Sequence, residues 1–93
     1  MTFLLKDPGA TLDYAIDWGS DYLSGDVLET SEWAVSPVEV GGVAIEGSQA
    51  DLLIATANVS GGVPGKLYRL TNQVTTASGR IDSRSIVLRV EQR

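Results

Sequence analysis

Residues 66–93 alternate apolar and polar side chains in two runs, which Ser78 and Gly79 separate. This period of two is typical of half-buried β-strands, with one face on a core and the other in water. Glycine accepts a positive φ without steric penalty, so Ser78-Gly79 is a turn signal. The pattern predicts a long antiparallel β-hairpin. Its candidate core residues are Tyr68, Leu70, Val74, Ile86, Leu88 and Val90.

Shorter segments of the same kind precede the hairpin, with turn residues between them. Strands are predicted at 2–6, 12–18, 27–36 and 51–59, and a bent strand or short strand pair at 38–46, broken at Gly41-Gly42. Tyr14, Trp18 and Trp33 join the candidate core. The connection 19–26 could hold one helical turn at 21–24. About seven strands with turns every 8 to 12 residues predict an all-β, antiparallel, immunoglobulin- or fibronectin-like sandwich, with residues 1–93 as one domain.

Tyr68 has a second possible role. It follows the Gly/Pro loop 60–65, and this segment resembles the approach to the sixth strand of immunoglobulin-like sandwiches. In those folds a tyrosine at the start of the strand bonds back to the preceding loop. Tyr68 is therefore either such a corner residue or an ordinary core tyrosine, and the sequence leaves both interpretations open.

Composition argues against an enzyme. The chain has no Cys and no His, which excludes disulfides, thiolate zinc sites and Cys nucleophiles, and removes the commonest general base. Asp13 and Asp17 share a strand face, but four strand residues separate them by about 13 Å. Glycosidase carboxylates lie about 5 to 9.5 Å apart. We expect no catalytic residues and no cofactor.

Two candidate binding sites have simpler explanations. Asp17, Asp21 and Asp26 flank a loop, but their spacing does not match an EF-hand, so a solvated acidic loop is favoured over a metal site. Trp18 and Trp33 could stack on sugar with Tyr22, although their apolar strand faces favour core packing. Tyr22 and Leu23 form an apolar pair in a polar loop, which suggests a docking contact.

The net charge of −5 and the pI of about 4.4 argue against a nucleic-acid partner. Residues 1–51 carry −9 and residues 52–93 carry +4. This asymmetry reflects either which strands face water or a self-complementary assembly. In the second case, basic residues of one copy would meet acidic residues of a neighbour. The candidates are Arg69, Arg80, Arg84 and Arg89 on one side, and Asp13, Asp17, Asp21 and Asp26 on the other.

No apolar run approaches the roughly 18 residues that a membrane span needs, and the first residues lack the basic and apolar regions of a signal peptide. We therefore expect a protein that is made in the cytoplasm and has no membrane partner.

Motifs along nearly the whole chain resemble a family of small virion proteins from tailed bacteriophages, the fibre–tail adaptors. They are Lys6-Asp7-Pro8, Ala10-Thr11-Leu12-Asp13-Tyr14, Asp17-Trp18, Leu23, Gly25-Asp26, Ser31-Glu32-Trp33, Ser60-Gly61-Gly62, Gly65, Tyr68-Arg69, Thr71-Asn72, Thr75-Thr76, Gly79-Arg80 and Asp82-Ser83-Arg84-Ser85. Residues 40–58 match only loosely.

The resemblance implies a non-enzymatic β-sandwich in the virion, present in several copies and bound to tail, fibre or head–tail proteins. A capsid decoration protein is the alternative in the same class. A carbohydrate-binding or adhesin module is the alternative in another class.

Overall fold

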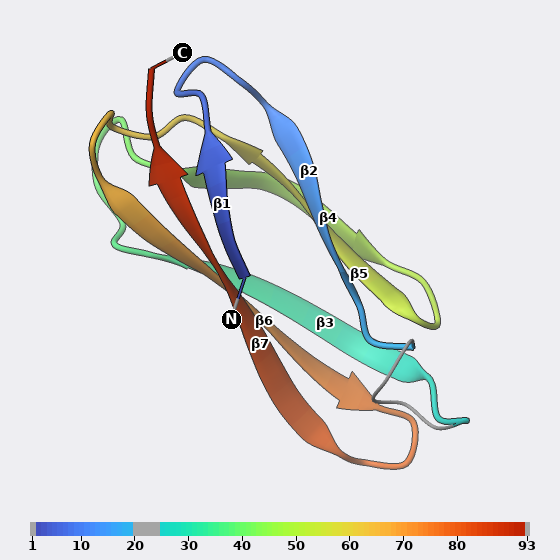
Figure 1. Cartoon of the computed structure of the whole chain (residues 1–93). Coiled ribbons are helices and arrows are strands. Elements are labelled where there is room, and N and C mark those ends of the chain that lie inside the picture. Colours follow the sequence, from blue (N-terminus) through green and yellow to red (C-terminus); the bar gives the residue numbers. More distant parts are fainter. Residues whose placement is uncertain (1, 20–24, 93) are drawn as a thin grey trace.

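Seven β-strands in two sheets make up the described part of the chain, residues 2–19 and 25–92 of the computed structural model (Figure 1). The strands are β1 (Thr2–Lys6), β2 (Leu12–Asp17), β3 (Leu28–Ser36), β4 (Ala44–Ala50), β5 (Ile54–Ser60), β6 (Leu67–Thr76) and β7 (Ile81–Val90). Those two ranges contain no helix. The all-β prediction with seven strands is confirmed, whereas the expected helical turn at 21–24 lies outside the described residues.

The two sheets face each other across one apolar core. The first has the order β1-β7-β6-β3 and the second β2-β5-β4. The molecule is elongated, with extents of 41 × 21 × 17 Å. Among the described residues, the backbones of the two sheets approach most closely where β3 lies near β4. The opposite side, where β2 faces β1 and β7, is therefore the more open side of the two-layer slab.

The predicted hairpin is confirmed. The N–H of Thr76 donates to the carbonyl of Arg80 at 2.8 Å, and Gly79 in the turn has a φ of 93°. The predicted core side chains are buried, except that Trp33 is partly buried and packs against the core. The buried ones are Tyr14, Trp18, Tyr68, Leu70, Val74, Ile86, Leu88 and Val90.

The prediction that all strands pair antiparallel is wrong for β1. This strand pairs with β7 in parallel, with Thr2 opposite Ile86 and Lys6 opposite Val90. After β1 the chain crosses to the other sheet, so β1 and β2 form no hairpin. Residues far apart in sequence can pair in parallel because no tight turn has to join them.

The predicted bent strand or short strand pair at 38–46 is wrong over residues 38–43. The strand there is β4, which begins at Ala44, because residues 37–43 form a turn in which the N–H of Gly42 donates to the carbonyl of Glu39. The next strand begins at Ile54 and not at 51. The carboxylate of Asp51 accepts the N–H groups of Leu53 and Ile54, which holds this segment in a turn.

A buried hydrogen bond connects the two sheets at the end of β2. The indole N–H of Trp18 donates to Oδ1 of Asn72 on β6 at 2.9 Å, and both side chains are fully buried. The amide nitrogen of Asn72 donates in turn to the hydroxyl of Ser31 and the carbonyl of Glu32 on β3. Asn72 thus satisfies the indole while anchoring its own strand to the neighbouring strand.

Tyr68 makes the bond expected of a corner tyrosine. Its ring is buried, and its hydroxyl accepts the N–H of Val63 in the preceding loop at 3.0 Å. The hydroxyl also donates to Oε1 of Glu39 at 2.6 Å, a partner that the sequence did not suggest. Burial, followed by the bond to Glu39, raises the pKa of Tyr68, while that bond and Lys66 lower the pKa of Glu39.

Replacing Asn72 tests how much this buried connection contributes to stability. Asn72→Ala leaves the Trp18 N–H buried without its acceptor, so the free energy of unfolding should fall by about 2–3 kcal/mol. Urea unfolding followed by tryptophan fluorescence measures it. The control is Gln73→Ala, an exposed neighbour on β6 whose effect should stay within about 0.5 kcal/mol. Equal effects of the two variants would contradict the role assigned to Asn72.

Candidate interaction surfaces

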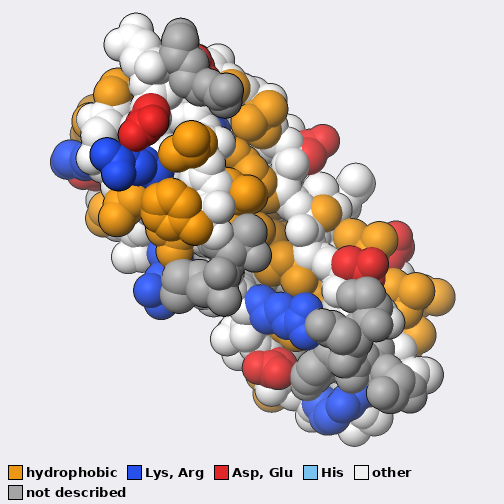
Figure 2. All heavy atoms as spheres, viewed as in Figure 1, with side chains coloured by type: hydrophobic (Ala, Val, Ile, Leu, Met, Phe, Trp, Pro, Cys, Tyr) orange, Lys and Arg blue, Asp and Glu red, His pale blue; other side chains and the backbone are white. Residues whose placement is uncertain are grey.

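An apolar patch lies on the outer face of the four-stranded sheet. It consists of Phe3 and Leu5 on β1, Leu67 on β6 and Val87 on β7. Phe3, Leu5 and Leu67 are 57%, 49% and 54% exposed, and Val87 is half-buried. Strand register makes the patch continuous, because Phe3 pairs with Val87, and Leu5 and Leu67 both pair with Arg89. Figure 2 shows hydrophobic side chains gathered over β1, with basic side chains beside them.

Two arginines border this apolar patch. Arg69 pairs with Val87, and Arg89 lies between Leu5 and Leu67. The Nε of Arg89 is 2.8 Å from a carboxylate oxygen of Glu91. Among the described residues, the structure gives Arg69 no ion-pair partner. Exposed apolar side chains bordered by arginine are a typical composition of protein-binding surfaces.

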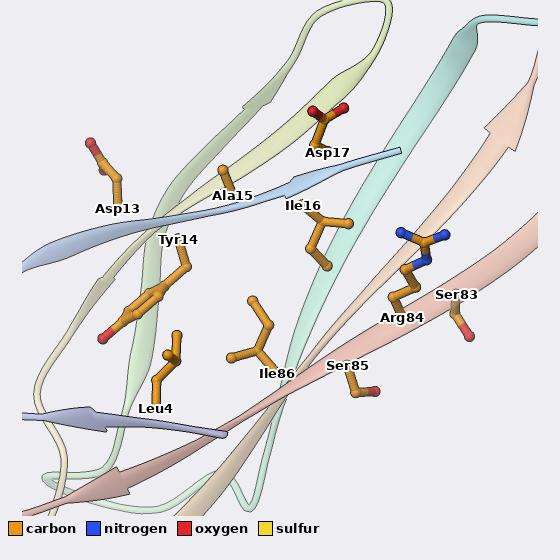
Figure 3. A pocket seen from close by; sticks show the side chains of 10 residues that line it. All are labelled: Leu4, Asp13, Tyr14, Ala15, Ile16, Asp17, Ser83, Arg84, Ser85 and Ile86. Carbon is orange, nitrogen blue, oxygen red and sulfur yellow. The ribbon is translucent and has the colours of Figure 1, made fainter. Parts of the chain in front are cut away.

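The outer face of the other sheet is acidic and polar. Asp13 and Asp17 project from β2 on the side away from the core, as Figure 3 shows, and Glu46 is exposed on β4. Asn58 donates to Asp13 at 2.7 Å, and Ser60 donates to Glu46 at 2.6 Å. Strands β2, β4 and β5 contain no Lys or Arg. The two outer faces therefore differ in both charge and polarity.

A groove with a volume of about 680 Å³ lies on the open side of the slab, between β2 and β7 (Figure 3). Tyr14 and Ile16 point into it from β2, and Ile86 and Leu4 face them from β7 and β1. The hydroxyl of Tyr14 is buried and has no hydrogen-bond partner among the described residues, and burial raises its pKa. Arg84 lies over the ring of Trp18, 4.5 Å from its centroid.

The candidate interaction residues do not form one site. Asp13 and Asp17 lie on one outer face, Arg69 and Arg89 lie on the other, and Arg84 lies at the groove. Arg80 pairs with Asp26 at 3.2 Å within the molecule. Asp21, Tyr22 and Leu23 lie outside the described residues. The described residues contain no group of three His, Cys, Asp or Glu side chains that could hold a metal ion.

Sequence reasoning missed two features. The apolar patch could have been found, because Leu67 shares strand parity with Arg69 and therefore faces outward. The second missed feature is the burial of Lys6, which no sequence pattern indicates. Its ammonium group is fully buried and donates to the carbonyls of Asp7, Ala10 and Gly61, joining β1 to the loop after β5. Burial lowers the pKa of Lys6, and the charge of Asp7 opposes this shift.

Comparison with known proteins supplies the family. A family model described as podophage GP4 fiber-tail adaptor protein gp77 matches residues 6–89, which is most of the chain. The chain belongs to this family. Its members are phage structural adaptors, so contact with other tail or fibre proteins follows for this chain. A comparison with curated proteins gave no match. No helix in ranges 2–19 and 25–92 is long and apolar enough to span a bilayer.

Asp26 gives the stability of this adaptor a specific pH dependence. Hydrogen bonds from the side chains of Ser78 and Thr76 lower the pKa of Asp26 far below its ordinary value, and the Val27 N–H and Arg80 act in the same direction. A lowered folded-state pKa stabilises the protein above the unfolded pKa of about 3.9, and this contribution is lost as the pH falls. Asp26→Asn should therefore be less stable than the unmodified chain at pH 7.

Urea titrations between about pH 7 and pH 2 measure this difference, which should shrink as the pH falls below about 4. Ser78→Ala serves as the second variant. It removes the largest cause of the shift while keeping the carboxylate, so it should reproduce part of the effect. A stability difference between Asp26→Asn and the unmodified chain that stays constant over this range would contradict the assignment.

Proposed function

We propose that this adaptor is a non-enzymatic connector whose two outer faces bind different virion components. The observation that carries the proposal is the apolar patch of Phe3, Leu5, Leu67 and Val87, which is exposed and bordered by Arg69 and Arg89. Burying an exposed Phe or Leu side chain in an interface contributes up to about 1.5–3 kcal/mol to the binding free energy. This patch can therefore supply much of the binding free energy of an interface.

The acidic outer face of β2-β5-β4 suits a second, basic surface. Asp13 and Asp17 project from it, and its three strands contain no Lys or Arg. Because Arg69 and Arg89 lie on the opposite face, adjacent copies of the chain could also meet head to tail. That arrangement closes into a symmetric ring when the rotation permits. Arg80 and Asp26 pair with each other inside one molecule, so we leave them out of the contact between copies.

We also infer that the two sheets form a single immunoglobulin-like sandwich. The strand order, β1-β7-β6-β3 against β2-β5-β4, and the bond from the Val63 N–H to the Tyr68 hydroxyl support this assignment. In this fold the strands provide two rigid outer surfaces. A sugar-binding platform built on Trp18 and Trp33 has less support, because Trp18 is fully buried and Trp33 packs against the core.

A double variant of the apolar patch tests this function. Phe3→Ser with Leu67→Ser should reduce the fibre content of virions at least tenfold, because the two lost apolar contacts together cost more than the 1.4 kcal/mol that corresponds to a tenfold change in affinity. Quantitative mass spectrometry of purified virions measures fibre protein per capsid. Both side chains are exposed, so the thermal unfolding midpoint should change little.

The control is Val40→Ser, which removes an apolar side chain that is 100% exposed and lies in the turn before β4, outside the apolar patch. Virions that carry this control should keep their fibres. A normal fibre content in the double variant would contradict the proposal, as would an equal loss in the control.

A further inference from the structure

Strand β7 extends beyond its partner β1. It pairs with β6 from Ile81 to Arg89, but β1 covers only the part from Ile86 to Val90. Figure 1 shows β1 beside only one half of β7. Over Ile81–Ser85, the edge that faces away from β6 has no strand beside it among the described residues. A β-strand edge without a partner is a template for the addition of another strand.

The backbone groups that face this edge can be identified. The N–H of Val90 donates to the backbone carbonyl of Lys66 on the β6 side. The N–H of Glu91 donates to the backbone carbonyl of Lys6 on the β1 side. Groups alternate between the two sides along a strand, so the N–H and C=O groups of Ile81 and Ser83 and the N–H of Ser85 point to the free edge, while the C=O of Ser85 faces the end of β1. The N–H of Ser83 donates to the carboxylate of its neighbour Asp82 at 2.8 Å, which satisfies one of them locally.

The groove adjoins the same stretch of β7. Ser83, Arg84, Ser85 and Ile86 form its β7 wall, and β2 forms the other (Figure 3). A strand added to the free edge would alternate its side chains between the outer face and the groove. The side chains that point inward would contact Ile16 and Ile86, which face each other across the groove.

We propose that an extended segment of a partner protein adds to β7 along Ile81–Ser85 and places apolar side chains in the groove. The segment would lie in line with β1 and lengthen that edge of the sheet. This inference rests on the proposed connector function and names the form of one partner, a strand of about five residues or about 16 Å. Such a contact combines backbone hydrogen bonds with a few apolar anchors, so a short, flexible tail of a neighbouring virion protein suffices.

The charge around the groove and the free edge indicates which residues the partner segment should carry. The charged residues that line the groove are Asp13, Asp17 and Arg84, and Asp82 lies on the stretch of β7 with the free edge. The local charge is therefore negative, in agreement with a net charge of −5 for the whole chain. A segment that alternates apolar residues with lysine or arginine is complementary to this surface.

The test uses the isolated, full-length protein and a synthetic seven-residue peptide of alternating valine and lysine. Amide hydrogen exchange is followed by NMR at saturating peptide. Exchange at Ile81 and Ser85 should slow at least tenfold. A peptide of the same composition with all lysines at one end should give less than twofold protection, because it cannot place its valines in the groove together.

Two controls isolate the backbone hydrogen bonds. Ser83→Pro removes an N–H that points to the free edge and should abolish protection, whereas Ser83→Ala keeps that N–H and should bind normally. The alternating peptide with N-methyl groups on its valines should not protect the unmodified protein, and this control needs no protein variant.

Three results with the peptide would overturn the proposal. They are no protection by the alternating peptide, equal protection in Ser83→Pro, and protection that appears at Asp13, Ala15 and Asp17 on β2 in place of Ile81–Ser85. Protection that rises with protein concentration without peptide would identify a second copy as the occupant, against our assignment. These measurements do not involve the apolar patch, so their failure is distinguishable from a failure of the fibre-content experiment.

Discussion

The hydrogen bond between Trp18 and Asn72 joins the two sheets inside the core. It is fully buried, and it connects the end of β2 to β6 in the opposite sheet. Through Ser31 and Glu32, the same Asn72 also holds β3 against β6. The second sheet is therefore anchored near one end of β2. Farther along β2, Tyr14 and Ile16 face β7 across the groove, and no strand among the described residues covers the edges there. The groove lies on this open side of the slab.

Several sequence segments that carry the family resemblance meet in space as structural contacts. Trp18 meets Asn72, and Asp26 meets Arg80. Lys6 bonds to Gly61, and at Gly62 a Cβ would lie 2.5 Å from a methyl group of Val90. These segments specify the scaffold. Phe3, Leu5 and Leu67 of the apolar patch lie outside them, so the patch can change without disturbing the contacts that hold the two sheets together.

The strict alternation of residues 66–93 was sufficient to predict β6, β7 and their inward-facing side chains, because each of these strands has one face on the core. The pairing of β1 could not be predicted. Its partner lies more than 80 residues away, and the five residues Thr2–Lys6 carry no signal for direction. The strand expected at 38–46 was wrong over residues 38–43, where Val38 and Val40 are exposed in a turn.

The charge pattern was informative only in part. The excess of acids in residues 1–51 and of bases in residues 52–93 gave the distribution of charge along the chain. This count could not distinguish between arginines that lie in different environments. Arg80 is paired at the hairpin turn and Arg84 lies over an indole, whereas Arg69 and Arg89 border the apolar patch. Only the fold distributes these side chains among a turn, a groove and an outer face.

The central claim is that this chain acts through the outer faces of a rigid two-layer slab. Cryo-electron microscopy of the intact virion tail tests it most directly, at a resolution that separates β-strands. We predict density for the slab between tail and fibre, with a neighbouring protein covering Phe3, Leu5 and Leu67. A map in which this face of β1-β7-β6 is open to solvent in every copy would contradict the claim.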